Sequence, residues 1–540
     1  MTAVAKNGSS ENQTLPRGLP IELYQHILSY IAPEHDSTLH IDKAIIKRQF
    51  LSVESLPPPA PTREFRDSIV DVGHFRRSCK RFADIGAPYI FTQVAIRFSE
   101  KGLQRLDDLA RWRNVARHVK RFSYLVPYFF EGGLNNLDEI KEELRELGLR
   151  PSDLGNLRRK AYEQRSIIAG EHDVHVLKRA IASFSSLQLI QILRVSERED
   201  EMVLQYLRGH AEARTTVNLD WTSACRHASH TIGVALLASN NVQPNRFSLP
   251  MASPSSARFL QVAGPNGIST LAERLTCLTL HFDDGDDLDT KIMELSDLFK
   301  TVFSRAKRMK AVHIGFPSHR PLTLPLASVF HHVAWDDLIA FGIQGWELDS
   351  EEIVEFLQRH ATKLRGVRLR DVHLKEGSQW KDVLSFLRDE MRQLLWVSLR
   401  RIGYTAFFHS PEYSQYAGAE VPPLDGDSEE DENEEDEQYA DGPSTHVDSA
   451  PSDDEIDHSE DDSDEQHDSD DEHGPDAHEM EFPNLNSPDT PASAPWCNCG
   501  GPGYLDLSDD LADDDVRIDN AKRKRWERWV LKRCPEHGER

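Results

Sequence analysis

The first apolar block of the chain has the spacing of a helix with one apolar side. In the segment LPIELYQHILSYI, Leu23, Ile27 and Ile31 recur at i, i+4 and i+8, with further apolar residues beside them. This stripe is typical of an amphipathic helix. Pro20 stands at the first helical position, where the missing N–H of proline costs nothing. We therefore expect a helix that begins near residue 20.

A second helix and a strand are expected after a loop at about residues 32–71. That segment is mixed in composition and carries a proline-rich run, so we interpret it as an insertion. In VGHFRRSCKRFADIGAPYIF, the apolar residues at 72, 75, 79 and 82 share one helical face, and Gly86 and Pro88 are expected to end the helix. The next segment, FTQVAIRF, alternates apolar and polar residues as a strand does.

The middle of the chain repeats the pattern apolar-x-x-apolar-x-apolar. Five segments carry it, with starts at residues 275, 309, 338, 364 and 394, and weaker matches start at 119, 187 and near 247. Apolar residues at helical spacing lie between them, within 292–302, 353–357 and 380–391. One strand–helix unit cannot bury its own apolar face, but a stack of units shares one core. The pattern predicts an α/β, leucine-rich-repeat-like domain, with an ordinary α/β domain as the alternative.

The acidic charge of the chain is concentrated in one segment. The formal charge is −27, yet residues 425–481 contain 28 acidic residues and no Lys or Arg, so the remainder carries +1. We expect residues 406–495 to be an acidic disordered region. No broad basic surface is implied, which argues against a general nucleic-acid binder. Four serines in this region match acidophilic kinase sites: Ser428, Ser452, Ser459 and Ser469.

The ends and the cysteines of the chain predict a cytoplasmic or nuclear protein. Residues 1–14 are polar, are expected to be disordered and lack the apolar core of a signal peptide. The longest apolar run, from Thr231 to Ala238, is far shorter than the roughly 20 residues that cross a bilayer. Six cysteines are too few for a disulfide scaffold of this length.

No catalytic motif is present in the sequence, so we predict neither an enzyme nor a cofactor. The C-terminal segment 496–540 holds one candidate zinc set, consisting of Cys497, Cys499, Cys534 and His537. The two pairs are separated by 34 residues, which is unusual, and we predict no metal. The same segment contains a basic amphipathic helix, whose Trp526 and Trp529 we expect to pack on the end of the repeat domain. Its residues 522–525 are alternatively a nuclear-localisation patch.

The two N-terminal helices together resemble an F-box, a short helical module that opens with Leu-Pro and contains a Cys-Lys-Arg-Phe core. The matching positions are Leu19, Pro20, Glu22, Leu23, Ile27, Leu28, Ile31, Cys79, Lys80, Arg81, Phe82, Ile85, Pro88 and Phe91. The chain differs from the module in its insertion of about forty residues, although loop-closure entropy rises only slowly with loop length. The sequence up to about Tyr404 is more loosely similar to F-box proteins of filamentous fungi.

The resemblance implies a substrate-recognition subunit of an SCF-type ubiquitin ligase, which catalyses nothing itself. The F-box-like module, residues 15–95, would bind the Skp-type adaptor, and the repeat domain, residues 96–405, would bind an unknown protein substrate. The implied adaptor contacts are Leu19, Pro20, Ile21, Leu23, Ile27 and Leu28, with Phe82 supporting them from the core. The alternative function is a repeat scaffold outside any ligase, whose acidic region binds basic partners such as histones.

Overall fold

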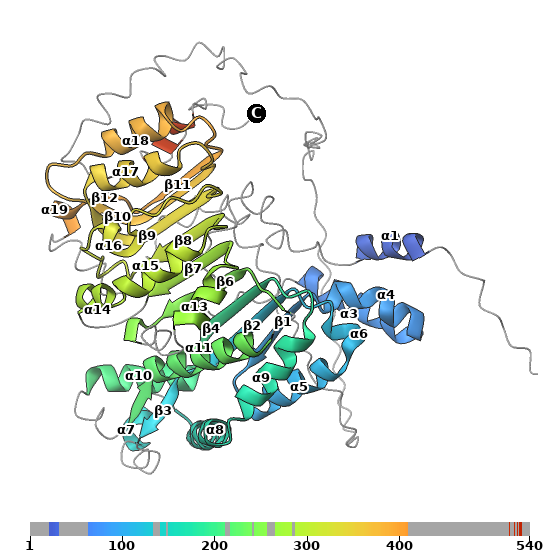
Figure 1. Cartoon of the computed structure of the whole chain (residues 1–540). Helices are drawn as coiled ribbons and strands as arrows, with labels where there is room; N and C mark the ends of the chain where they lie inside the picture. The colour runs from blue at the N-terminus through green and yellow to red at the C-terminus, as the bar shows by residue number, and fades with distance from the viewer. Residues whose placement is uncertain are drawn as a thin grey trace, which may run out of the picture. The chain divides into compact units, whose positions relative to one another are not determined.

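The computed structural model describes most of the chain from residue 21 to residue 408. The described residues are 21–31, 63–132, 141–146, 149–210, 217–239, 242–255, 265–282, 287–408, 518, 523, 526, 527 and 529–531. They form an α/β structure around one large parallel sheet (Figure 1), which confirms the α/β class that the sequence predicts. The insertion at residues 32–62, the first 20 residues and nearly all of the acidic region lie outside the described residues.

Three helices form the N-terminal part. Helix α1 (Ile21–Ile31) has the predicted extent. The expected second helix is instead two helices, α3 (Arg63–Ser78) and α4 (Lys80–Ile90). They are separated because Cys79 is extended, with φ −162° and ψ 166°. Two predictions are therefore wrong: residues 63–71 are helical rather than loop, and α4 continues through Gly86 and Pro88. Pro88 is tolerated because it lies in the last turn of α4.

Ten strands form the parallel sheet, and their order in space follows their order in the chain. They are β1 (Gln93–Arg97), β2 (Arg121–Pro127), β4 (Leu189–Val195), β6 (Arg246–Ala252), β7 (Cys277–Phe282), β8 (Ala311–Gly315), β9 (Ala340–Leu348), β10 (Gly366–Leu374), β11 (Trp396–Arg400) and the short β12 (Gly403–Tyr404), which pairs with β10. Every segment in which the sequence pattern predicted a strand contains one of β1 to β11. Strand β1 pairs with β2 and is therefore the first strand of the sheet. The predicted domain boundary at 95/96 falls inside this strand.

Helices lie between the strands and cover one face of the sheet (Figure 1). They are α5 (Glu100–Arg111), α6 (Arg113–Ala116), α9 (His172–Ser183), α11 (Trp221–Ala238), α13 (Pro265–Ala272), α14 (Leu288–Glu294), α15 (Ser296–Arg305), α16 (Leu326–Phe330), α17 (Ser350–His360), α18 (Trp380–Asp389) and α19 (Thr405–Phe408). Alternate strand residues and the apolar helix stripes share one core. The stripe at 292–302 belongs to two helices, because the chain leaves the helical path at Leu295.

Neighbouring strands are joined by backbone hydrogen bonds at the point where they begin. The acceptor is the carbonyl group of the residue just before each strand, and we call this series of carbonyl groups the carbonyl ladder. The carbonyl of Thr276 accepts from the N–H groups of Lys310 and Ala311, and the carbonyl of Lys310 accepts from those of Ile339 and Ala340. The same arrangement joins eight successive pairs of strands, through the residues at 92, 120, 188, 245, 276, 310, 339 and 365. Each strand is therefore placed by its predecessor with the same register, which keeps equivalent side chains in rows across the sheet.

A second, smaller core lies beside the sheet and was not predicted. It is built from β3 (Phe129–Gly132), β5 (Asn218–Asp220), α7 (Lys141–Glu146), α8 (Pro151–Ala169) and α10 (Arg198–Gly209). Strands β3 and β5 pair antiparallel, and Lys160 bridges Glu197 (3.2 Å) and the fully buried Asp200. These elements occupy the two long connections around β4, where the sequence repeat is irregular.

Strands β9 and β10 bend together at left-handed residues. Gly345 has φ +66° and Asp371, the residue that falls between the paired positions of β10, has φ +49°. A side chain at 345 would meet the carbonyl oxygen of Phe316 at 2.2 Å, so glycine is required there. After β11, Arg401 has φ +48°, and its guanidinium group binds the Asp371 carboxylate at 2.5 and 2.8 Å. The ion pair therefore links the bend in β10 to the bend that follows β11.

The C-terminal segment covers the end of the sheet at β11. Trp526, Trp529 and Val530 are buried in the main core. The guanidinium carbon of Arg388, in α18, lies 4.3 Å from the centre of the Trp529 ring, and the N–H of Leu399, in β11, donates to the Glu527 carboxylate at 2.5 Å. The predicted packing of the two tryptophans is confirmed. Arg523, within the suggested localisation patch, is buried as well.

The C-terminal tryptophans should contribute strongly to stability. We expect Trp529→Ala to lower the free energy of unfolding by about 3–5 kcal/mol, because it leaves a cavity and removes the contact with Arg388. Trp112, which is 60% exposed, offers the control, and Trp112→Ala should change stability by less than about 1 kcal/mol. Urea unfolding followed by circular dichroism measures both, and equal effects would contradict the packing.

Candidate partner-binding surfaces

Helix α1 is apolar on two sides, and one of them is exposed. Tyr24 and Leu28 face the neighbouring helices, whereas Leu23, Ile27 and Tyr30 follow one another at i, i+4 and i+7 on another side. Leu23 is 45% exposed, Ile27 44% and Tyr30 77%. We name these three residues the α1 outer face. Three large apolar side chains adjacent on one helix form the kind of patch that marks an interaction site.

The inner side of α1 is fixed on α3 and α4 by a small core. Leu28 and Val72 are fully buried and Ile85 nearly so. The ring of Phe82 stacks on that of Phe75, with centres 4.3 Å apart, and lies 5.0 Å from that of Tyr24. The hydroxyl of Tyr89 also donates to the carbonyl of Gln25 at 3.2 Å. These contacts hold α1 so that its outer face points away from the other two helices.

The predicted adaptor contacts do not all reach this surface. Ile21, Leu23 and Ile27 are exposed as expected, and Phe82 lies in the small core as expected. Leu28 corrects the prediction, because it is fully buried and supports the outer face from beneath. Leu19 and Pro20 lie outside the described residues, as do the candidate zinc set at 497, 499, 534 and 537 and the four serines at 428, 452, 459 and 469.

Two exposed residues of this part were not singled out from the sequence. Tyr30 extends the stripe of Leu23 and Ile27 by one turn, so helical spacing alone could have identified it. Val70, 51% exposed on α3, could not be found because the segment 32–71 was interpreted as a loop.

The second candidate surface is the face of the sheet opposite the helices. Strand alternation directs Val367 and Leu369 into the core with the helices, and Arg368 and Arg370 to the other face. Equivalent positions on neighbouring strands carry basic and other polar residues, beside a row of small or apolar residues formed by Cys277, Ala311, Ala340 and Trp396. We name the following the polar sheet face: Arg121, Gln191, Arg246, His281, His313, Glu347, Arg368, Arg370, His373 and Arg400.

Positive groups lie close together on the polar sheet face. His313 and Arg368 stand in one row, separated by the strand position of Gly342, which has no side chain to come between them. Burial lowers the pKa of His313 well below its usual value, and the charges of Arg368, His281 and Arg370 lower it further. Nearer β1, the Gln191 amide oxygen accepts from Arg121 Nε at 2.6 Å and from Ser123 Oγ at 2.9 Å.

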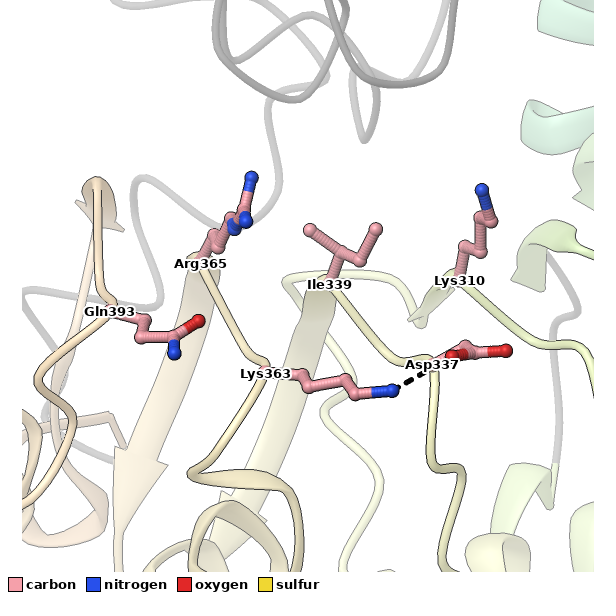
Figure 2. Close-up of a pocket in the computed structure, with 6 residues that line it drawn as sticks. All are labelled: Lys310, Asp337, Ile339, Lys363, Arg365 and Gln393. Carbon is pink, nitrogen blue, oxygen red and sulfur yellow. Dashed lines mark hydrogen bonds and ion pairs between the residues drawn. The ribbon is translucent and has the colours of Figure 1, made fainter.

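A shallow hollow of about 340 Å³ lies at the edge where the strands begin (Figure 2). It is lined by Lys310, Asp337, Ile339, Lys363, Arg365 and Gln393. Lys363 Nζ binds Asp337 Oδ1 at 3.0 Å, and this bond lowers the pKa of the Asp337 carboxyl. Arg365, Ile339 and Lys310 point outward from the starts of three neighbouring strands in Figure 2. The lining combines cations with an ion pair and includes no Ser, Thr, Cys or His side chain.

Some cysteine and histidine side chains lie in the core or contact the backbone. Cys225 and Cys277 are buried, and burial raises the pKa of the Cys277 thiol. His331 lies with Nε2 2.8 Å from the carbonyl oxygen of Ser296. Among the described residues, no group of three or more His, Cys, Asp or Glu side chains could hold a metal ion. None of the helices in the described ranges is long and apolar enough to cross a membrane.

Comparison with known proteins gives no family for this chain. No protein-family model matches the sequence, and no curated protein is significantly similar to it. A function for the chain is therefore inferred from the surfaces described above.

The two sides of α1 should respond differently to truncation. We expect Leu28→Ala to speed hydrogen exchange of the α1 amides by about thirtyfold or more, because removal of a buried leucine side chain costs about 2–5 kcal/mol. Leu23→Ala should change the exchange rate less than about threefold, since Leu23 is half-exposed. Hydrogen exchange with mass spectrometry of peptides over 21–31 measures both rates, and similar acceleration by the two variants would refute the orientation of the helix.

His313 should make the fold sensitive to acid. Its pKa is lowered in the folded state, so the unfolded chain binds the proton more strongly and stability falls as the pH drops below about 6.5. Between pH 7.5 and pH 5.5, the free energy of unfolding should fall in both chains. We expect the fall in His313→Gln to be about 1 kcal/mol smaller than in the parent chain. Urea unfolding at both pH values tests this, with the exposed His175→Gln as a control that should behave like the parent. An unchanged pH dependence in His313→Gln would contradict it.

Proposed function

We propose that this protein is the substrate-recognition subunit of an SCF-type ubiquitin ligase. The observation that carries the proposal is the α1 outer face, which presents Leu23 and Ile27 on the helix whose sequence resembles the start of an F-box. Single exposed aliphatic residues are common on monomers, but here Leu23, Ile27 and Tyr30 adjoin one another on one helix. A partner protein that covered them would remove the exposed apolar surface.

The energetics of this surface suit a protein interface. Complete burial of a leucine or isoleucine contributes about 1.5–3 kcal/mol, so covering the exposed half of each contributes about 1 kcal/mol. Tyr30, at 77% exposure, adds an aromatic residue of the type that is common at interface hot spots. Leu28 and Phe82 beneath them make the surface rigid, which reduces the entropy that binding costs.

The connection between the module and the sheet supports a receptor role. Helix α4 leads into β1 after only two residues, and the Asn114 amide, in α6, donates to the Asp84 carboxylate at 3.3 Å. The guanidinium carbon of Arg76 also lies 4.6 Å from the centre of the Phe91 ring. A receptor needs such a junction, because the target must be held at a fixed distance from the adaptor for ubiquitin transfer.

The sheet supports the finer prediction of leucine-rich-repeat-like units. Sequential parallel order, one repeated carbonyl ladder and helices on one face are what stacked strand–helix units require. In this arrangement we place the protein target on the side of the sheet opposite the helices, where the half-buried His281, Arg370 and Arg400 lie at the border of the polar sheet face. The repeat-like assignment, like the adaptor, remains part of the proposal.

The adaptor assignment is tested by charge on the α1 outer face. We expect the double variant Leu23→Asp/Ile27→Asp to abolish co-purification of the Skp-type adaptor, because two carboxylates cannot be buried in an apolar contact without a partner. The matched control is Leu237→Asp/Met293→Asp, two residues of similar exposure in the sheet domain, which should retain the adaptor. Retention of the adaptor by the first variant would refute the proposal.

The scaffold alternative makes a different prediction in the same experiment. A chain that worked outside any ligase would retain basic partners such as histones through residues 425–481, whatever the state of α1. Such binding would weaken at high salt because it depends on exposed charges. Adaptor binding through the apolar α1 outer face would persist.

A further inference from the structure

The hollow at the start of the strands is lined by more positive than negative groups (Figure 2). Its lining contains three cations, those of Lys310, Lys363 and Arg365, and one carboxylate, that of Asp337. Lys363 Nζ binds this carboxylate at 3.0 Å, so one positive charge is compensated and two remain uncompensated. Within the described part of the chain, no carboxylate forms an ion pair with Lys310 or Arg365. The lining therefore carries a positive charge that it does not neutralise itself.

The Asp337 carboxylate responds to the positive charge around it. The hydrogen bond from Lys363 is the largest cause that lowers the pKa of Asp337, and the charges of Lys310 and Arg308 lower it further. Arg308 is exposed in the turn before β8 and is not part of the lining. A second anion in the hollow would be attracted by the same cations that stabilise the Asp337 carboxylate.

The carbonyl ladder fixes the points from which the two uncompensated cations extend. Lys310 comes just before β8 and Arg365 just before β10, with Ile339 before β9 between them. The N–H of Lys310 donates to the carbonyl of Thr276 at 2.7 Å, and that of Arg365 donates to the carbonyl of Ile339 at 2.8 Å. Parallel strands are about 4.8 Å apart, so the two cationic residues stand about 10 Å apart along the edge of the sheet. Two long side chains at this spacing can reach one anion between them.

The side chain of Ile339 provides an apolar surface between the two cations. Figure 2 shows it pointing to the same side as Lys310 and Arg365. Ile339 is half-buried and packs against the apolar row that includes Ala311 and Ala340. Such a residue excludes water from one side of a bound anion, which strengthens the hydrogen bonds that the cations donate. Gln393, from the turn before β11, adds an amide group to the lining.

We infer that the hollow is a binding site for a phosphate monoester. This group carries a charge of about −1.5 to −2 at pH 7, which matches the two uncompensated cations. A single carboxylate would leave one of them without a partner. The planar guanidinium group of Arg365 can bind two phosphate oxygens at once, while Lys310 acts as a compact charge. The volume of about 340 Å³ lies at the low end of the range for small-molecule sites, so the hollow suits one phosphorylated group rather than an extended polyanion.

The inference does not rest on the adaptor, and its first test uses the unaltered full-length chain. Phenylglyoxal modifies accessible arginines, and mass spectrometry gives the rate at each residue. At constant ionic strength, saturating O-phosphoserine should slow the modification of Arg365 about fivefold or more, because an occupied site does not react. Arg392, exposed in the turn before β11, should change less than about twofold, and serine should protect neither residue. Equal protection of the two arginines, or protection of neither, overturns the inference.

Three substitutions locate the contact, with affinity measured from the protection of Arg365. Lys310→Gln should weaken phosphoserine binding about tenfold or more, because a charge-assisted hydrogen bond is lost. Lys307→Gln removes the same charge from an exposed position outside the lining and should leave affinity within about twofold. Asp337→Asn removes the carboxylate of the lining and frees Lys363, so affinity should rise about threefold or more. Equal losses in the two lysine variants, or weaker binding by Asp337→Asn, would contradict the site.

A comparison of ligands identifies the source of the phosphate group. A phosphorylated side chain of a protein binds through its neighbours as well. The best members of a pool of phosphoserine peptides with random flanking residues should then bind about tenfold or more tightly than free phosphoserine. Equal affinities identify a free phosphorylated molecule as the ligand, and either result supports the phosphate site. Equal binding of the pool without phosphate would overturn it, whether or not the adaptor proposal holds.

Discussion

The carbonyl ladder before the strands is the constraint on which the rest of the structure depends. Each carbonyl receives two N–H groups from the start of the next strand, as Lys310 does from Ile339 and Ala340, so no strand can slip relative to its predecessor. Because the register is constant, apolar side chains stay in rows on the helix side and polar ones stay in rows on the other. A one-residue slip at any strand would exchange the two faces from that point onward.

A sheet built this way has two ends, and each end constrains the segment beside it. At β11 the backbone N–H of Leu399 needs an acceptor, and Glu527 supplies one while Trp529 covers the neighbouring apolar surface. This requirement explains why Trp526 and Trp529 follow a long segment that is mostly polar.

The strands could be predicted from the sequence because their pattern is local. LRGVRL at residues 364–369 already shows which positions face the core, and its Arg368 proves to lie on the polar sheet face, whereas Arg365 precedes β10 and lines the hollow. What was missed depends on tertiary contacts. The smaller core around α8 has no repeat to indicate it, and the break at Cys79 is a backbone conformation that the surrounding apolar spacing does not encode. The near-neutral average charge likewise concealed a face on which one sign dominates.

Helix α1 shows why the same apolar pattern can serve both stability and recognition. Leu23, Ile27 and Leu28 are similar in hydrophobicity but lie on two sides of the helix, and the position of α3 and α4 decides which side is covered. Those two helices can shield less than the full circumference of α1, because three helices around one small core leave an outer surface on each. A helix with apolar residues only on the side that faces its neighbours would have a polar outer surface. The aliphatic residues on this remaining side are half-exposed in the described structure, which is why we propose that a second polypeptide covers them.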